Sequence, residues 1–378
     1  MSHIVTPFLE MSQAIMEAGG EALKKCYQCG TCAGTCPWRP LTEFNIRKFV
    51  RMAQLGFEEI GDYMWGCSTC KFCVDRCPRG VELIDIVKAV RGVYSEGGML
   101  PSSLRALVGS LSARGNPWSG DIEKRNEWTQ GKYPLYESGM DYLYFTCCTV
   151  SYDQRNAQVA KATAELLNRA GVSWGIPGTN VNCCGESIGK VGDQNLFERL
   201  KEKNRSVFRD LKVKKVIVIS PHCYSTFVKE YGDDYEVVHF TEILSGLIKE
   251  GKLTPKRDMG GTKVTYHDPC YLGRHSGIYD APRDILKVIP GLEFVEMDRT
   301  REQSMCCGGG GGGLWIERAK GERLSDLRVA EAMEKEASIL STACPYCIAM
   351  LEDSIRTMNA DERIKVKDIS ELVFDSLE

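Results

Sequence analysis

Two copies of one cysteine pattern constrain this chain more than any other feature. The spacing Cys-x-x-Cys-x-x-Cys-x-x-x-Cys-Pro occupies residues 26–37 and recurs at residues 67–78. Three thiolates two residues apart can wrap one face of a [4Fe–4S] cube, and in paired copies the fourth cysteine ligates the other cluster. Zinc knuckles are the alternative, because Cys-x-x-Cys pairs suit tetrahedral zinc. The third cysteine, the Cys-Pro ending and the lack of a histidine within residues 26–78 favour clusters.

The spacing also divides these eight cysteines into two ligand sets. Helical patterns over residues 8–25, 43–54 and 81–94 surround them, and no strand pattern is visible. We therefore predict an all-α, ferredoxin-like domain with two cubane clusters over residues 1–96. One cluster is expected on Cys26, Cys29, Cys32 and Cys77, and the other on Cys67, Cys70, Cys73 and Cys36.

Composition excludes several classes of protein. The chain has 378 residues, 18 of them cysteine, and its net charge of −3 gives no basic field that would indicate nucleic-acid binding. No apolar run approaches the roughly 18 residues of a membrane span, and the N-terminus lacks the form of an export signal. The cysteines are therefore expected to be metal ligands or redox thiols of a cytoplasmic protein rather than disulfides.

The ten remaining cysteines lie in an internal repeat. Its matched segments are Cys148 with Cys270, residues 183–185 with 306–308, and residues 220–223 with 344–347, at offsets of 122 to 124 positions. Chance recurrence of several cysteine features at nearly one offset is improbable. We interpret the two copies as homologous halves that divide near residue 256.

Short β-rich runs alternate with helical patterns through the same region. The runs are residues 142–146, 216–220, 237–240, 263–267, 292–296 and 339–342. Such alternation predicts α/β layers with largely parallel strands. Together with the repeat it predicts two homologous α/β domains, residues 141–255 and 256–378, after a linker at residues 97–140 that is rich in Gly, Ser, Pro and Trp.

The two-cluster domain and the paired Cys-Cys-Gly repeats together resemble the heterodisulfide reductase family, specifically its fused D-type subunit, over nearly the whole chain. In that family each complete repeat, Cys…Cys-Cys…Cys-x-x-Cys, binds a non-cubane [4Fe–4S] cluster that reduces a disulfide. The resemblance therefore implies one non-cubane cluster in the second repeat, where every cysteine is matched: Cys270, Cys306, Cys307, Cys344 and Cys347.

The first repeat departs from this pattern, because Ser220 stands where Cys344 stands in its twin. We expect a simpler [4Fe–4S] cluster there, with a site that lacks a cluster as the alternative. Cys147 has no counterpart in the second repeat and is either a packing residue or a spare neighbour. The four matching cysteines are Cys148, Cys183, Cys184 and Cys223.

Glycines and one histidine beside the cysteines are further candidates. Gly185, Gly308 and Gly309 are expected to let backbone approach the clusters. The six-glycine run 308–313 lacks the Gly-Lys-Ser/Thr ending of a phosphate loop, so it is either a flexible loop or close-fitting backbone at the cluster, and we favour the second. His267, three residues before Cys270, either donates a proton in disulfide reduction or hydrogen-bonds the strand end.

The resemblance implies an iron–sulfur oxidoreductase subunit in which electrons enter at the cubane clusters, pass the first repeat and cleave a disulfide at the second. A pure electron relay between a dehydrogenase or flavoprotein and a quinone or cytochrome module is the alternative. Because no flavin or nicotinamide fingerprint is present, hydride chemistry is expected on a partner. Expected partners are a haem b membrane subunit, a flavoprotein or HdrA-like subunit, and a disulfide substrate or small thiol-carrier protein. Attachment to the cytoplasmic face of a membrane is expected only through a partner.

Overall fold

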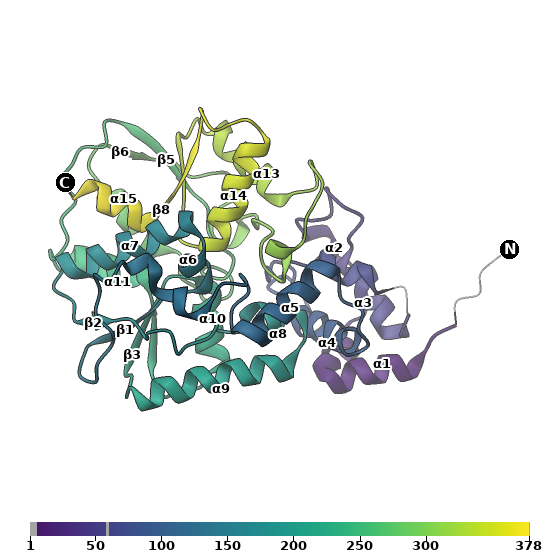
Figure 1. Cartoon of the computed structure of the whole chain (residues 1–378). Helices are drawn as coiled ribbons and strands as arrows, with labels where there is room; N and C mark the ends of the chain where they lie inside the picture. Colours follow the sequence, from purple (N-terminus) through teal and green to yellow (C-terminus); the bar gives the residue numbers. More distant parts are fainter. Residues whose placement is uncertain (1–5, 58–59, 378) are drawn as a thin grey trace.

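The structure is a computed structural model that describes residues 6–57 and 60–377 (Figure 1). Its N-terminal part is helical, and no strand is assigned among the described residues before 142. The expected helix over residues 8–25 is broken, because Gly19 takes a φ of +101° between its turns. The elements, in order, are α1 (Leu9–Ile15), η1 (Met16–Gly20), η2 (Glu21–Lys25), α2 (Thr31–Thr35), α3 (Ile46–Leu55), η4 (Asp62–Gly66) and α4 (Leu83–Glu96).

Helices α3 and α4 form the framework of this part. Asn45 caps α3 by accepting hydrogen bonds from the backbone N–H groups of Arg47 and Lys48, and Gly56 ends it in the left-handed conformation. Helix α4 buries the apolar face that its sequence predicts, with Ile86, Val87 and Val90 fully covered. The cysteines lie before and between these helices, on connecting segments as expected except for Cys32, which lies in the short helix α2.

The segment predicted as a linker has secondary structure of its own. It forms α5 (Ser102–Arg114) and the 3₁₀-helix η5 (Ile122–Thr129), which pack on the repeats. Leu104, Leu107 and Leu111 of α5 are buried at helical spacing. The sequence did not predict this short amphipathic helix, because Gly, Ser and Pro residues surround its pattern.

Two four-stranded parallel sheets confirm the predicted fold class. Their strand orders are β2-β1-β3-β4 and β6-β5-β7-β8, so the two repeats share one topology. All six predicted runs contain strands, whereas the two edge strands β2 and β8 lie outside those runs. The strands are β1 (Tyr142–Phe145), β2 (Trp174–Gly175), β3 (Lys215–Val218), β4 (Glu236–His239), β5 (Thr262–Tyr266), β6 (Leu292–Phe294), β7 (Ile339–Thr342) and β8 (Lys365–Asp368).

Helices complete each α/β unit. Those of the first repeat are α6 (Cys148–Tyr152), α7 (Gln154–Arg169), α8 (Glu186–Val191), α9 (Gln194–Asp210), α10 (Pro221–Glu230) and α11 (Phe240–Lys249). Those of the second are α12 (Asp280–Lys287), η6 (Arg301–Gln303), η7 (Gly313–Trp315), α13 (Leu324–Glu334), α14 (Pro345–Thr357) and α15 (Ile369–Ser376). Figure 1 shows the two sheets at one end of the molecule, with helices such as α7 and α15 between them, and the N-terminal helices at the other end.

The topology places the repeat cysteines at one edge of each sheet. In both sheets the two central strands are followed by cysteines, three of them in the first turn of the next helix: β1 by Cys148, β3 by Cys223, β5 by Cys270 and β7 by Cys347. The connections leave these neighbouring strands in opposite directions, which opens a crevice at their carboxyl ends. Parallel-sheet geometry therefore gathers thiols that lie far apart in the sequence.

Candidate iron–sulfur sites

The structure brings the eight N-terminal cysteines together in the two predicted groups. Each group lines its own cavity, and in each the fourth cysteine crosses over from the other sequence copy. The outer cavity is lined by Cys26, Cys29, Cys32 and Cys77. The inner cavity is lined by Cys36, Cys67, Cys70 and Cys73. We name these the outer and inner ferredoxin sites; iron ligation at them stays a prediction.

The loops of these sites are shaped to present N–H groups to sulfur. Thr69 donates its backbone N–H to Cys67 Sγ at 3.4 Å, and Val81 donates to Cys77 Sγ at 3.4 Å. Gln28, Thr69 and Lys71 take positive φ values of 65°, 51° and 68°, which turn the backbone around the cavities. Such donors stabilise thiolate and sulfide, so the loops fit a cubane cluster.

The two ferredoxin sites differ in their access to solvent. Cys29 of the outer site is exposed, and Tyr27, two residues before it, is 61% exposed. Cys70 of the inner site is buried. Burial raises the pKa of the Cys67 thiol to about 11, so this sulfur becomes a thiolate only when a metal replaces its proton. The outer site is therefore the place where a partner can approach.

The five cysteines of the second repeat converge in the interior. Cys270 and Cys306 Sγ lie 3.9 Å apart, and Cys307 and Cys347 Sγ lie 3.3 Å apart. None of the five is more than 6% exposed, and all 18 cysteines of the chain are free thiols. Burial by itself would raise the pKa of Cys344, but hydrogen bonds from Cys347 and His222 outweigh burial and lower this pKa to about 5. The set is a preformed group of sulfur donors.

His267 lies beside these sulfurs with a fixed proton position. Its Nδ1 accepts a hydrogen bond from Arg328 Nε at 3.1 Å, which leaves the proton on Nε2. The Nε2 atom is buried without a partner among the described residues. Burial, with the nearby Arg328 cation, lowers the pKa of His267 to about 3. One ring nitrogen of His267 lies within 4.8 Å of the Cys307 and Cys347 sulfurs.

These unpartnered donors show that the second repeat fits an iron–sulfur cluster. Besides His267 Nε2, the buried Arg274 Nη2 lacks a partner within the described part of the chain. Arg274 is anchored by its Nε, which donates to the Cys70 carbonyl at 2.8 Å, and by its Nη1, which donates to the Ser304 carbonyl at 2.6 Å. Buried N–H groups beside a thiol cluster need acceptors, and the sulfides of a cluster would supply them.

The first repeat gathers its cysteines as well, with one addition. Cys148, Cys183, Cys184 and Cys223 are buried within it, and Arg125 Nη1 donates to Cys148 Sγ at 3.5 Å. Hydrogen bonds to Cys147 and Cys184 raise the pKa of Cys223 well above its usual value. Cys147 therefore lies in contact with the group and brings it to five sulfurs, although Ser220 replaces the usual cysteine. Sequence reasoning had left the place of Cys147 open.

Aromatic side chains fill the space between the two repeats. The His222 ring stacks on Tyr271, with centroids 4.0 Å apart, and lies 4.5 Å from Tyr346. His222 Nδ1 is 3.3 Å from Glu186 Oε1, an ion pair without hydrogen-bond geometry. Burial lowers the pKa of His222, but Glu186 outweighs it and the pKa rises to about 10. The sequence reading did not identify this buried cluster, because its members come from both repeats.

The glycine run joins the second repeat to the inner ferredoxin site. A Cβ on Gly310 would lie 2.6 Å from the Ser68 carbonyl oxygen, and one on Gly311 would lie 2.7 Å from that of Cys67. Both glycines are buried, which agrees with close-fitting backbone rather than a flexible loop. Gly309 lies over Cys307, where a Cβ would be 3.7 Å from Sγ, while Gly308 takes a φ of +91°.

The remaining predicted glycine, Gly185, also lies close to a neighbouring side chain. Gly185 has a φ of +87°, and a Cβ there would lie 2.7 Å from the Phe197 ring, so it directs the chain after Cys184 into α8.

Ser68 Oγ, which accepts from Trp38 Nε1 at 3.1 Å, lies 3.6 Å from Cys306 Sγ. The inner ferredoxin site thus contacts the second repeat directly, whereas we expected electrons to pass the first repeat before the second.

Arg91 holds these parts together. It is fully buried on α4, and its two terminal nitrogens donate to four carbonyls: Met64 at 3.0 Å, Cys67 at 2.8 Å, Lys190 at 3.0 Å and Gly311 at 2.8 Å. These carbonyls belong to the inner ferredoxin site and to both repeats. One cation therefore fixes the relative positions of three sulfur sites.

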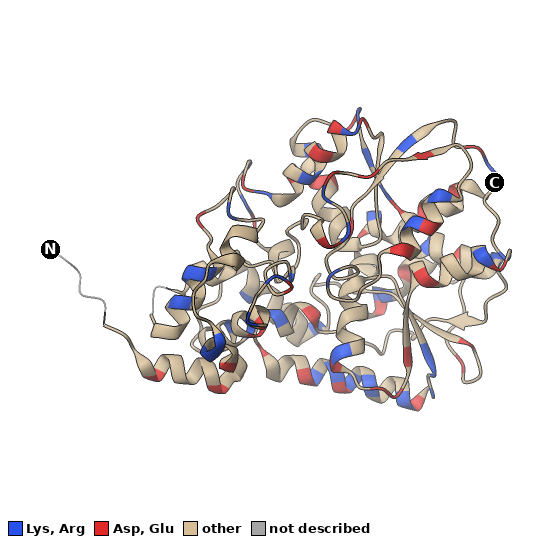
Figure 2. Ribbon diagram, turned by 180° about the vertical axis from the view of Figure 1, so that it is seen from behind, with Lys and Arg blue, Asp and Glu red and all other residues tan. Residues whose placement is uncertain are grey.

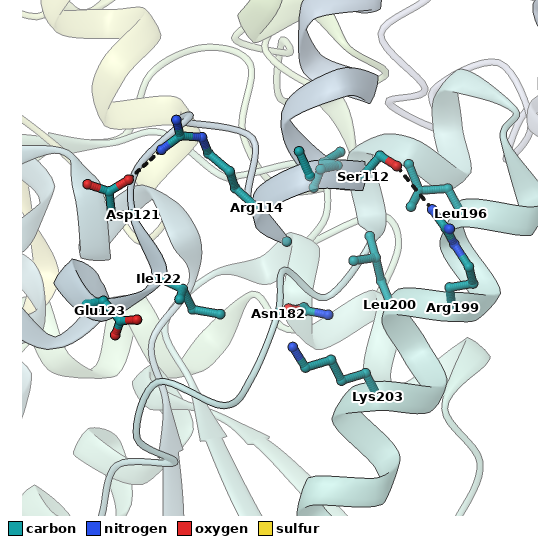
Figure 3. Close-up of a pocket in the computed structure, with 13 residues that line it drawn as sticks. Ser112, Arg114, Asp121, Ile122, Glu123, Asn182, Leu196, Arg199, Leu200 and Lys203 are labelled. Carbon is teal, nitrogen blue, oxygen red and sulfur yellow. Dashed lines mark hydrogen bonds and ion pairs between the residues drawn. The ribbon is translucent and has the colours of Figure 1, made fainter.

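A surface pocket lies beside the first repeat (Figure 3). Asn182, the residue before Cys183, lines it, and the Cys183 backbone N–H donates to the Gly115 carbonyl at 2.7 Å. Two basic side chains that line the pocket already have protein partners. Arg114 forms an ion pair with Asp121, and Arg199 donates a hydrogen bond to Ser112. The pocket brings solvent to within one residue of the first-repeat thiols.

Comparisons with known proteins agree with this geometry. Residues 22–81 match the 4Fe-4S dicluster domain, and residues 142–228 and 264–352 each match the cysteine-rich domain known as CCG. The D-type subunit of the dihydromethanophenazine:CoB–CoM heterodisulfide reductase from Methanosarcina mazei is 33% identical, over 94% of this chain and 94% of that protein. The chain belongs to the family of heterodisulfide reductase D-type subunits.

Two longer relatives are more similar in sequence. A "Probable iron-sulfur-binding oxidoreductase FadF" of Bacillus subtilis is 39% identical over 83% of this chain. An "EtfAB:quinone oxidoreductase" of Syntrophomonas wolfei subsp. wolfei is 36% identical over 83% of this chain. The chain spans about half the length of these two relatives, 46% of each. Within the described residues, none of the helices has the length and apolar character that a membrane crossing requires.

Proposed function

We propose that this chain is an electron-relay subunit that passes single electrons between partner proteins and breaks no sulfur–sulfur bond itself. The observation that carries the proposal is the contrast in access between its sulfur sites. The outer ferredoxin site is exposed at Cys29, whereas no cysteine of the second repeat is more than 6% exposed. A substrate disulfide must touch its reducing centre, but an electron need not.

The order of the sites supports a relay. The outer and inner ferredoxin sites share crossed-over cysteines, and the inner site contacts Cys306 of the second repeat through Ser68 and Cys70. His222, the neighbour of Cys223 in the first repeat, hydrogen-bonds Cys344 of the second. Iron–sulfur clusters, when bound, supply one-electron chemistry, and this chain's residues set their order: outer, inner, second repeat, first repeat.

The cofactors that we propose follow the donor sets. Two cubane [4Fe–4S] clusters would be held by the ferredoxin sites, a non-cubane [4Fe–4S] cluster by the second repeat, and a further [4Fe–4S] cluster by the first. Cys147 gives the first repeat a fifth sulfur, so that site is better supplied than its sequence pattern indicates. The proposed ligands otherwise remain those predicted from the sequence.

The proposed partners are a flavoprotein that delivers electrons and a quinone- or cytochrome-linked module that removes them. One relative is named for EtfAB and quinone, and both of the longer relatives contain sequence beyond the part matched by this chain. No hydride-binding motif stands out in the sequence, so two-electron chemistry belongs to the partner. A cytoplasmic location, at the membrane face through such a partner, is part of this proposal.

The relay is tested with the anaerobically reconstituted chain. The dithionite-reduced protein is mixed in turn with a menaquinone analogue, with oxidised electron-transferring flavoprotein and with small-molecule and protein disulfides, while cluster signals are followed by electron paramagnetic resonance. We expect oxidation by a redox partner and no response to any disulfide. Stoichiometric thiol formation with loss of the second-repeat signal would overturn the relay.

Disulfide reduction is the second candidate, and one observation favours it: the second repeat retains all five cysteines of the family pattern. The relative from Methanosarcina mazei, named as a heterodisulfide reductase, also matches along 94% of its length. For this function a disulfide would have to displace the His222, Tyr271 and Tyr346 rings that fill the space between the repeats. His267 stays a predicted proton donor only in this case, although its Nδ1 is committed to Arg328.

A further inference from the structure

The outer ferredoxin site is surrounded by basic side chains. Arg47 and Arg79 line its cavity together with the four cysteines. Arg51 lies one turn beyond Arg47 on α3 and donates to Gln54, whose amide in turn donates to the Cys26 carbonyl at 2.9 Å. Lys25 immediately precedes Cys26. We name Lys25, Arg47, Arg51 and Arg79 the basic rim.

The charges of the basic rim are not neutralised by the protein. All four side chains are exposed, and none has a carboxylate partner in the described parts of the chain, whereas the neighbouring Lys24 pairs with Glu21. Helix α3 carries Arg47, Lys48 and Arg51 and no acidic residue, and Figure 2 shows the resulting basic stretch. The positive field is local, because the chain as a whole has a net charge of −3.

An aromatic side chain lies at the centre of this field. Tyr27, between two cysteines of the outer site, is 61% exposed and lines the cavity together with Cys29 and Arg79. Exposed Tyr and Arg side chains are typical anchors of protein interfaces, and unpaired like charges accelerate encounters with a surface of opposite sign. A small reductant needs neither feature.

We propose that the basic rim is the docking surface for an electron-carrier protein with an acidic face around its own redox group. The proposal deepens the proposed relay by naming the chemistry of the partner, and it rests on that relay. A protein occupant is favoured over an anionic membrane because the rim is centred on an exposed cysteine of a redox site and on an exposed tyrosine. A membrane surface would require charge but no alignment with Cys29.

The test uses reduced flavodoxin, a small acidic carrier, as the probe. Its second-order reaction with the oxidised, fully reconstituted chain is followed anaerobically by stopped flow at low and high ionic strength. Lys25→Glu/Arg51→Glu, which changes the two rim residues that do not line the cavity, is compared with Lys132→Glu/Arg257→Glu, which makes the same charge change at exposed positions elsewhere. Iron content and visible absorbance show that both variants hold their clusters, and methyl viologen radical provides a small cationic reductant that needs no docking.

We expect the rim variant to react with flavodoxin about tenfold more slowly than the control at low ionic strength, with the difference shrinking at high salt. Its reaction with methyl viologen radical should be no slower. Equal flavodoxin rates for the two variants at low salt would overturn the proposal. So would loss of sedimentation with phosphatidylglycerol vesicles at an unchanged flavodoxin rate, because the rim would then contact a membrane. A failure of the proposed relay would look different from a failure of the docking proposal. The reaction with flavodoxin would persist, but the electron paramagnetic resonance signal of the second repeat would never develop.

Discussion

Replacing His267 by phenylalanine should lower the reduction potential of the iron–sulfur cluster that we propose for the second repeat. Phenylalanine is the natural choice because Phe145 occupies the equivalent place in the first repeat, 122 positions earlier. In the native chain Arg328 donates to His267 Nδ1, so Nε2 carries the proton; it has no partner among the described residues, and one nitrogen of this ring lies within 4.8 Å of the Cys307 and Cys347 sulfurs. A donor of this kind stabilises the more negative, reduced state.

The magnitude follows from the hydrogen bond that is lost. A hydrogen bond to a charged group contributes about 1.5–3 kcal/mol, and only the part that differs between oxidation states alters the potential. If that part is about 1 kcal/mol, the one-electron potential falls by roughly 45 mV, since 59 mV corresponds to a tenfold change in equilibrium constant. His267→Gln keeps a side-chain N–H donor and should restore part of the shift.

The assay is an anaerobic redox titration followed by electron paramagnetic resonance. His239→Phe is the matched control, because His239 is also fully buried but both of its nitrogens have protein partners, Thr241 and the Ile219 carbonyl. We expect its potential to remain that of the native chain. The reasoning is refuted if His267→Phe retains full iron and its potential is unchanged, or if the control shifts equally.

Three further predictions concern stability and iron binding. Burial and the nearby Glu371 raise the pKa of Asp368 to about 7, and its Oδ2 has no partner among the described atoms. The Asp368 carboxyl group therefore binds a proton more tightly in the folded chain than in the unfolded chain. Stability should therefore fall as pH rises from about 4 through 7, by about 1 kcal/mol between pH 6 and 8, and thermal unfolding of Asp368→Asn should lack that slope. Arg91→Met leaves four buried carbonyls without their donor and should cost at least about 3 kcal/mol, measured by denaturant unfolding; a loss below about 1 kcal/mol would contradict its joining role. Cys147→Ser should lower iron content and alter the first-repeat signal, as we also expect for Cys183→Ala, while unchanged iron would make Cys147 a packing residue.

The sequence by itself determined the local chemistry of this protein. Cysteine spacing within residues 26–37 and 67–78 specifies the crossed-over ferredoxin groups, because ligands two residues apart on a turn can only wrap one cube face. The repeat offset and the alternation of strand and helix specify two α/β units, and the cysteines after β1, β3, β5 and β7 then meet because carboxyl ends of parallel strands share one sheet edge.

Only the tertiary structure decided how these parts face one another. Nothing local to Ser68 indicates contact with Cys306, 238 positions away, and nothing local to Arg91 indicates four carbonyl partners in three parts of the chain. The tautomer of His267 likewise depends on Arg328, 61 positions later. Packing between domains is set by the sum of many non-local contacts, whereas spacing and periodicity record only the neighbours within one turn, strand or helix. The burial of the second-repeat cysteines is set by such non-local contacts. The choice between relay and disulfide chemistry rests on this burial.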